Sequence, residues 1–381
     1  MRLLTLFCVL CFSMSNVTYA QNVSDRNKQA MQSQARVVQG AQEQGKEQIN
    51  QRGKKRFSEV QRQMRSGKIK FIGGKPTFKI KPNPILNHPI KSVTGDNIPR
   101  NIKSIAKEQR VIANKIKAVE QEYITAARAK GIDLDILVVK NCPDRTRFDW
   151  RSLGKVTPVK DQASCGSCTT FGTLGAFEGN NAVRNGLLWD SSEQHLLSCE
   201  PNVDCSGGSR PALAQYMVDT GTSTEAAYPY TATDSACNTA ILTPHDAIAW
   251  DHVSGANPTV SELKEALCEY GPIAIGIWAT SAFQAYDSGI YNETVSTTRS
   301  NHAMTLVGWD NSDGGYWIVK NSWGTTDWGE SGFGRIAWGS NNVGKWANWI
   351  QAPIIKIMTP ADWKRVLIAR KVPLINRYIL R

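Results

Sequence analysis

Cysteine usage constrains this chain more than any other feature, because it ties the fold to the compartment in which the chain matures. The 381 residues include nine cysteines, and Cys8 and Cys11 lie within the first twenty residues. That stretch, "MRLLTLFCVLCFSMSNVTYA", has Arg2, an apolar run and Ala20, which is typical of a secretory signal cut after the alanine. No later stretch is apolar enough to cross a bilayer. We therefore expect an exported product (secreted, periplasmic or in a lysosome-like compartment), not a cytoplasmic one.

Seven cysteines remain once the signal is removed. They are Cys142, Cys165, Cys168, Cys199, Cys205, Cys237 and Cys268. An oxidising compartment favours pairing them. Because seven is odd, at least one is free or pairs with another molecule. A lone thiol in an exported protein needs a chemical reason.

Charge and composition divide the chain near residue 141. Residues 21–141 hold 25 Lys and Arg against 10 Asp and Glu, a net charge of +15. Residues 142–352 hold 12 against 22, a net of −10, and residues 353–381 hold 7 against 1, a net of +6. The overall charge of +12 invites a nucleic-acid interpretation. Blocks of opposite sign are more typical of arms that stay solvated or pair within one molecule, so we expect no nucleic-acid partner.

Three local patterns occur before this boundary. Residues 21–66, rich in Gln, Lys and Arg, indicate a solvated helix or disorder. Five prolines predict extended chain over 72–99. An amphipathic helix is predicted between Asn101 as N-cap and Gly131 as stop. The apolar stripe of this helix has to be buried against other residues. It could pack within a small helical domain of its own, or, as the more specific expectation, on the acidic body. "DILVV" at 135–139 indicates a short extended run.

The acidic body is rich in Gly, Trp and Cys and should hold many short strands. Strands rich in β-branched and aromatic residues are predicted at 271–278, 302–309 and 315–321. A helix is predicted directly after the second cysteine of "CGSC". In the tail, residues 359–372 predict a basic helix with Thr359 as N-cap.

The stretch "DQASCGSCTTF" at 161–171 places two cysteines three apart and permits four interpretations. A zinc site would need a second ligand pair, and "CEPNVDC" is spaced too widely to supply it. A redox pair needs a compact βαβ setting. Two structural half-cystines would leave another thiol free. The last interpretation makes Cys168 a nucleophile and Cys165 a half-cystine.

The nucleophile interpretation has specific requirements. A thiolate is the attacking species, and a helix N-terminus and a nearby imidazolium both lower the pKa of a thiol. Cys168 lies where the predicted helix begins. His302 opens a predicted strand 134 residues downstream, and Asn321 follows at 153 residues, where its carboxamide can orient the imidazole. A C-G-[SA]-C signature with His and Asn at about these distances fits a catalytic arrangement.

From about residue 147 to 350, the chain resembles the papain-like cysteine peptidases (papain/cathepsin type). The matching motifs, in order, are "DWRSLGKVTPVKDQASCGSC", "SSEQHLLSC", "CSGG", "AAYPY", "NHAMTLVGW" and "NSWGTTDWGESGFGRI". The resemblance implies that Cys168 is the nucleophile, His302 the general base and acid, and Asn321 the orienting residue. It implies that Gln162 and the backbone N–H of Cys168 form the oxyanion hole.

The resemblance also implies a substrate groove. Trp323 would cover the Asn–His contact, and Gly207 and Gly208 would form an edge where a substrate backbone pairs in β fashion. The residues expected to line the main pocket are Ser209, Arg210, Ser300, Asn301 and Ala303. Arg210 could favour an acidic partner or point to solvent. Thr169 stands where the family usually has Trp or Tyr, which leaves the pocket wider or wetter.

The resemblance also accounts for most of the seven cysteines. The resemblance implies disulfides Cys165–Cys205 and Cys199–Cys237, and we hypothesise that Cys142 pairs with Cys268. Cys168 would be the one free thiol.

The implied fold is α+β, the papain-like two-lobed fold, with a helical lobe and a β-barrel-like lobe preceded by a mostly helical pro-segment. We expect a signal at 1–20, a basic pro-segment at 21–141, a peptidase domain at 142–352 and a basic extension at 353–381. The pro-segment would inhibit as part of the same molecule, running backwards through the groove. Its positive charge would hold it on the acidic body, and low pH would weaken that hold. The tail could dock on the body, contact anionic membranes or be trimmed.

The expected activity is that of a monomeric endopeptidase that acts on proteins or peptides and needs no metal or organic cofactor. Two alternatives belong to other classes. One is an inactive, peptidase-shaped binding protein, which Thr169 suggests. The other is a thiol oxidoreductase that uses Cys165 and Cys168.

Overall fold

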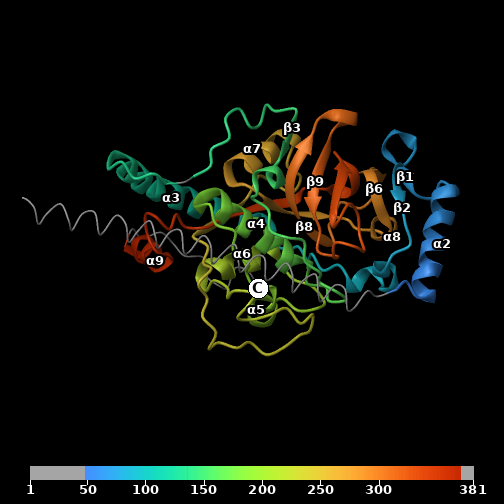
Figure 1. Cartoon of the computed structure of the whole chain (residues 1–381), viewed down its shortest axis with the longest axis horizontal. Coiled ribbons are helices and arrows are strands. Elements are labelled where there is room, and N and C mark those ends of the chain that lie inside the picture. The colour runs from blue at the N-terminus through green and yellow to red at the C-terminus, as the bar shows by residue number, and fades with distance from the viewer. Residues whose placement is uncertain (1–47, 135, 370–381) are drawn as a thin grey trace, which may run out of the picture. The chain divides into compact units, whose positions relative to one another are not determined.

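The computed structural model describes residues 48–134 and 136–369 (Figure 1). The predicted signal at 1–20 lies outside these residues, as do 21–47 and 370–381. The described residues from Ile49 to Ala369 belong to one compact unit. Within the described ranges, every helix is too short or too polar to span a bilayer.

A nine-stranded, mostly antiparallel sheet forms the β-rich part of this unit (Figure 1). Its order is β2 (Thr77–Ile80), β6 (Tyr286–Tyr291), β10 (Phe333–Ala337), β9 (Tyr316–Lys320), β8 (His302–Asp310), β5 (Ile273–Ile277), β11 (Lys345–Gln351) and β4 (Ala249–His252). Off this path, β3 (Arg147–Asp149) pairs with β8, and β10 with β6 is a parallel pair. A separate ribbon joins β1 (Lys70–Phe71) to β7 (Glu293–Thr294). The strands predicted at 271–278, 302–309 and 315–321 correspond to β5, β8 and β9.

The helical lobe is organised around α4 (Cys168–Asn185), the helix predicted after "CGSC". Every side chain from Cys168 to Val183 is buried, since α4 packs against β8, β5 and β11 as well as other helices. A Cβ on Gly175 would lie 2.3 Å from Thr305 Oγ1, so the absence of a side chain lets α4 approach the sheet. The other helices of the body are α5 (Glu193–Cys199), α6 (Arg210–Asp219), α7 (Val260–Tyr270) and α8 (Ser281–Gln284). Short 3-10 turns are η4 (Trp150–Leu153), η5 (Ser312–Gly314) and η6 (Ser340–Asn342).

Three disulfides stitch the body together, and they are the same three pairs that the sequence analysis expects. They are Cys142–Cys268, Cys165–Cys205 and Cys199–Cys237. Cys168 is the free cysteine among the described residues. Cys165 therefore has no thiol to offer a redox partner, so the oxidoreductase alternative is wrong.

The segment before residue 141 is built onto the body. Its elements are α2 (Gln51–Arg65), η1 (Ile72–Gly74), η2 (Pro84–Asn87), η3 (Ile90–Ser92) and α3 (Ile102–Ala129), with strands β1 and β2. In Figure 1, β2 lies at the β6 edge of the sheet. The apolar stripe of α3, including Ile105 and Ile116, belongs to the same core as Trp250 of the body. The helix thus docks on the acidic body, and the alternative of a separate helical domain is wrong.

The segment between α3 and the body and the segment after the body also have defined positions. Residues 136–139 form no strand, but the N–H of Leu137 donates to the Val183 carbonyl. In the tail, α9 (Pro360–Ala369) is capped by Thr359, whose Oγ1 accepts from the Asp362 N–H. Trp363 is fully buried against Tyr123 of α3. The described part of the tail therefore docks on the rest of the molecule.

Candidate active site

Cys168 is the first residue of α4, and its side chain has no exposed area. The N–H of Ala303 donates to its sulfur at 3.4 Å. Ala303 follows His302 at the start of β8, so this contact brings the beginning of β8 to the N-terminus of α4. Helix and strand come from the two lobes, and the thiol lies where they meet.

His302 is held by two neighbours. Its Nε2 donates to Asn321 Oδ1 at 2.8 Å, and Asn321 directly follows β9, the neighbour of β8 in the sheet. The indole of Trp323 stacks on the imidazole with centroids 4.5 Å apart, as expected for a residue that covers the Asn–His contact. His302 Nδ1 has no hydrogen-bond partner among the described residues. With Nε2 as the donor, the neutral ring keeps a free lone pair on Nδ1.

Gln162 is fully buried beside the same site. Its Oε1 accepts from Ser322 Oγ at 2.7 Å, which fixes the direction of the amide. Its Nε2 donates to the Cys165 carbonyl at 2.7 Å and to the Val93 carbonyl at 3.3 Å. The second bond shows that the Gln162 amide can donate a hydrogen bond to a carbonyl of another segment that enters the site.

Residues 93–97 of the N-terminal segment occupy this site. The Trp323 indole N–H donates to the Val93 carbonyl at 3.1 Å. The N–H of Gly208 donates to the Gly95 carbonyl, and the Gly208 carbonyl accepts from the Asn97 N–H, both at 2.8 Å. These bonds make Asp96 and Gly208 a parallel β-bridge. The segment thus runs along the edge that the glycines were expected to form.

Glycines permit this close approach. A Cβ on Gly95 would lie 2.0 Å from the Gly166 carbonyl oxygen and 2.6 Å from the Gly207 Cα. Gly207 has a φ of +129°, and a Cβ there would lie 2.5 Å from the Gly95 carbonyl oxygen. Any larger residue at either position would push the two backbones apart.

Asp96 enters a buried pocket next to this bridge. Its Oδ1 accepts from Arg210 Nε at 3.0 Å, its Oδ2 accepts from Arg210 Nη2 at 3.3 Å, and neither side chain has exposed area. Ser300 Oγ also donates to Asp96 Oδ2, at 2.6 Å. Arg210 thus faces an acidic partner and not solvent.

The remaining expected pocket residues contribute in different ways. The Asn301 carbonyl accepts from the Asp96 N–H at 2.9 Å, while its side chain binds the backbone of Ala279. Ser209 caps α6 by position, and its Oγ has no partner among the described residues. Thr169 is fully buried with an unpaired Oγ1, and a Cβ on Gly208 would lie 3.1 Å from it. Thr169 is therefore closed to solvent while residues 93–97 occupy the site.

The electrostatics of this form keep both reacting groups neutral. Burial, and after it the Asp96 carboxylate, raise the pKa of the Cys168 thiol to about 12, although the N–H groups of Ala303 and Gly95 act in the opposite direction. Burial also lowers the pKa of His302 to about 4, although Asn321 and Asp96 raise it. A thiol and a neutral imidazole are therefore the species at pH 7 while residues 93–97 occupy the site.

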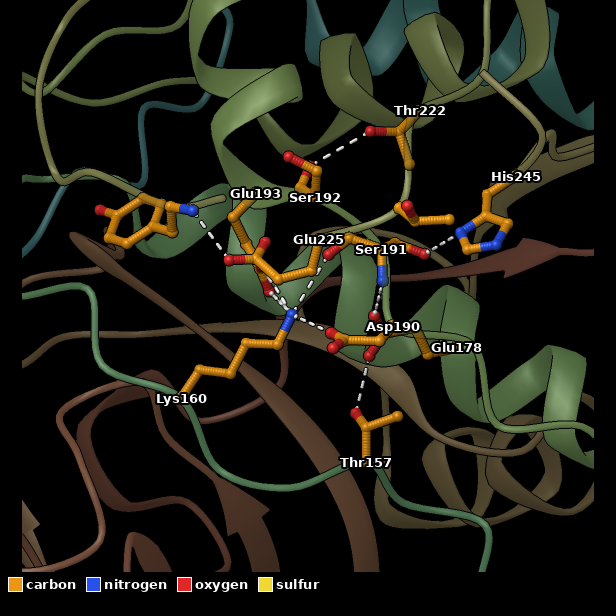
Figure 2. A network of polar contacts seen from close by, with 12 residues as sticks. Thr157, Lys160, Glu178, Asp190, Ser191, Ser192, Glu193, Thr222, Glu225 and His245 are labelled. Atoms are coloured by element: carbon orange, nitrogen blue, oxygen red, sulfur yellow. Dashed lines mark hydrogen bonds and ion pairs between the residues drawn. The ribbon is translucent and has the colours of Figure 1, made fainter. Parts of the chain in front are cut away.

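A network of charged side chains surrounds Lys160 (Figure 2). It adjoins the site, because Lys160 and Glu193 line a small cavity together with Asn321. Lys160 Nζ lies 2.8 Å from Asp190 Oδ1 and 2.7 Å from Glu193 Oε2. Glu178 of α4 accepts from Thr157 Oγ1 at 2.7 Å and from the Ser191 N–H at 2.8 Å. Burial raises the pKa of Glu178 and of Glu193 to about 7, and Lys160 acts in the opposite direction on both. This network ties the loop before Gln162 to α4 and α5.

Sequence reasoning missed three partners of the site. Asp96 is an isolated acid in a basic segment and carries no motif. Val93 and Gly95 also have no recognisable signal, because their role depends on where the segment crosses the body. Among the described residues, no group of three or more His, Cys, Asp or Glu side chains is placed to hold a metal ion.

The fold and the site together define a class: an α+β protein in which a free cysteine at a helix N-terminus meets a histidine–asparagine pair from a sheet. Comparison with known protein families gives the same class. The model of the "Papain family cysteine protease" family matches residues 145–354. The chain belongs to the papain family.

Named relatives and solved structures support the same assignment. Digestive cysteine proteinase 1 of Homarus americanus is 41% identical over 209 residues, covering 52% of this chain and 64% of the relative. Cathepsin L1 of Drosophila melanogaster is 33% identical over 291 residues, covering 73% and 72%. The structure of digestive procathepsin L 3 of Tenebrio molitor larval midgut has a TM-score of 0.58 at 25% identity, covering 79% of this chain and 90% of that one. The chain thus spans less than two thirds of the length of the lobster relative.

Proposed function

We propose that this chain is an exported cysteine endopeptidase made as a zymogen, with residues 142–352 as the peptidase domain and residues 21–141 as the pro-segment. The observation that carries the proposal is the arrangement of Cys168 and His302. The thiol lies at the N-terminus of α4 and accepts from the residue next to His302, whose ring is held by Asn321 with Nδ1 unpaired.

The reaction follows from these positions. His302 takes the thiol proton, and the Cys168 sulfur attacks a peptide carbonyl, forming a C–S bond and an oxyanion. Gln162 Nε2 and the Cys168 N–H donate to that oxyanion. The intermediate collapses, the C–N bond breaks, and His302 returns the proton to the leaving amine. Water, deprotonated by His302, then attacks the thioester, and the C–S bond breaks to release the acid.

The pro-segment would keep this site closed. Residues 93–97 cover Cys168 and pair with Gly208 in the parallel direction. They therefore run opposite to a substrate strand that pairs antiparallel with the same edge. The burial that they impose favours the neutral thiol and imidazole. Removing the segment would return water to both groups and take away the Asp96 carboxylate. Both changes would lower the pKa of the Cys168 thiol, because burial and Asp96 raise it.

The test is to process the full chain until the pro-segment is cut and then to assay peptide hydrolysis and labelling by a thiol-directed peptide inhibitor. Wild type should cleave and label at Cys168 alone. Cys168→Ser and His302→Ala should lose cleavage by a factor of at least about 10³. Unchanged melting temperatures of the unprocessed variants would confirm their folding.

An inactive, peptidase-shaped binding protein is the second candidate, and Thr169 is the only residue that favours it. A processed wild type that neither cleaves nor labels, although its peptide groove is open, would support that candidate and contradict the first.

A further inference from the structure

We propose that Arg210 makes the pocket beside Gly208 selective for an acidic side chain, so that the processed enzyme prefers peptides that place Asp or Glu there. The proposal rests on the proposed peptidase function and names the substrate class of the same site.

The guanidinium of Arg210 is fixed by the body, independently of the pro-segment. Its Nη1 donates to the Trp346 carbonyl at 2.9 Å and to Asn348 Oδ1 at 3.0 Å, and its Nη2 donates to the Lys345 carbonyl at 3.0 Å. The Nε hydrogen and the second Nη2 hydrogen are left to point into the pocket. Asp96 takes both in the present form. Two parallel donors of this kind match the two oxygens of a carboxylate.

The pocket is also shaped for a carboxylate. Ser300 Oγ supplies a third donor to the Asp96 carboxylate. A Cβ on Gly276 would lie 2.8 Å from Asp96 Oδ2, so only glycine at that position leaves room for the acid. Lys345 and Arg299 line the adjoining cavity, and Asp96 is the only acidic side chain among the described residues around it. Nothing in the described lining offers Arg210 a second carboxylate.

Removal of the pro-segment takes Asp96 away and leaves this cation in a pocket that opens on the substrate groove. The backbone of residue 96 pairs with Gly208 and with the Asn301 carbonyl, the edge along which a substrate would also pair. A substrate carboxylate at the residue beside Gly208 would restore the two bonds of Arg210. A neutral side chain would leave a buried charge without its counterion, which costs far more than losing an exposed pair.

The experiment uses the processed enzyme and reporter peptides that differ at one residue. Asp is compared with Asn, and Glu with Gln, at each of the first three positions before the cut bond, and kcat/KM is measured for every peptide. We expect the acid to be preferred over its amide by about 30-fold or more at one position and by little at the other two. Because the pair is buried, the preference should persist when salt is raised.

Variants separate the pocket from general charge effects. Arg210→Gln should abolish the acid preference, while Arg147→Gln, which removes an exposed arginine of β3, should leave it intact. Should Arg210→Gln fail to fold, Ser300→Ala removes one donor and should reduce the preference without removing the cation.

Equal rates for acid and amide at every position, in an enzyme that cleaves other peptides, would overturn the pocket assignment while leaving the peptidase intact. A processed enzyme that cleaves nothing and does not label at Cys168 would instead overturn the proposed function, and this inference with it.

Discussion

Substituting Asp96 by Asn should open the zymogen without changing its shape. The variant keeps the size of the side chain and removes its charge, so Arg210 stays buried with no counterion. Both partners of the present pair have no exposed area, and Arg210 and Ser300 together make three hydrogen bonds to the carboxylate. Breaking one partner of a buried pair costs about 3–5 kcal/mol, and an amide oxygen that still accepts one bond reduces that to roughly 2–4 kcal/mol.

That free energy opposes docking of residues 93–97 over Cys168. At 1.4 kcal/mol per tenfold, the open fraction of the zymogen should rise by roughly 30- to 700-fold. The assay is alkylation of Cys168 in the unprocessed chain at neutral pH, because the fully buried sulfur can react only when the segment lifts. The rate of alkylation then reports the open fraction directly.

A matched control removes a surface contact between the same two parts of the chain. Lys117 of α3 pairs with Glu269 at 2.9 Å, and their side chains are 35% and 59% exposed. Such a pair contributes about 0–1 kcal/mol, so Lys117→Gln should change the alkylation rate by no more than about fivefold. If Asp96→Asn reacts no faster than Lys117→Gln, the argument that the buried pair holds the segment fails.

Three further predictions concern packing and charge. Thr169→Trp should lower the melting temperature of the zymogen, because the larger ring has to fit a fully buried position in contact with Gly208; overpacking costs typically 1–3 kcal/mol, and an unchanged melting temperature would contradict it. In urea unfolding, Lys160→Met should destabilise the protein more at pH 8 than at pH 5. Burial raises the pKa of Glu178 and of Glu193 to about 7, above their values in the unfolded chain, so the protein loses stability as the pH rises through that range. Removing Lys160 raises both pKa values further and so increases this loss. Burial raises the pKa of Asp251 from 3.8 to about 6 even beside Arg110 of α3, so docking favours its protonated form. The Asp251→Asn zymogen should therefore open less than wild type at pH 7, and the difference should shrink as the pH falls from 6 towards 3.8; a difference that grows on acidification would refute the sign.

The last prediction bears on how acid would release the pro-segment. Burial raises the pKa of Glu120 as well as that of Asp251, so both carboxylates favour docking as the pH falls. Any weakening at low pH has to come from other carboxylates, such as the exposed Glu269 that pairs with Lys117. The expectation that acid loosens the segment through its carboxylates therefore does not extend to these two groups.

Local patterns in the sequence predicted most of the elements that carry the site. The helix after "CGSC" is α4, because its apolar and small residues suit a helix buried on all sides, and the apolar, β-branched stretch after His302 is β8. The odd number of cysteines pointed to one free thiol, and Cys168 is that residue among the described cysteines. These features depend on residues close together or on simple counting.

Features that depend on long-range geometry were not predictable. Charge blocks suggested that a basic segment is held by an acidic body, and exposed pairs such as Lys117–Glu269 follow that polarity. Two buried pairs have the opposite polarity, with the acid on the basic segment and the arginine on the body. Asp96 binds Arg210, and Glu120 binds Arg184. Net charge averages over whole segments and cannot locate a single acid in a buried pocket. The pairing of β2 with β6 was likewise missed, because four residues carry too weak a strand pattern.

The central claim is that removing the pro-segment lets a sulfur anion at Cys168 and a protonated ring at His302 form. The most direct measurement is the rate of Cys168 alkylation as a function of pH in the processed enzyme and in its His302→Ala variant. Wild type should react rapidly well below the ordinary thiol pKa of about 8.5, and the variant should lose that low-pH reactivity and follow an ordinary thiol. Identical profiles rising only near pH 8.5 in both proteins would contradict the account.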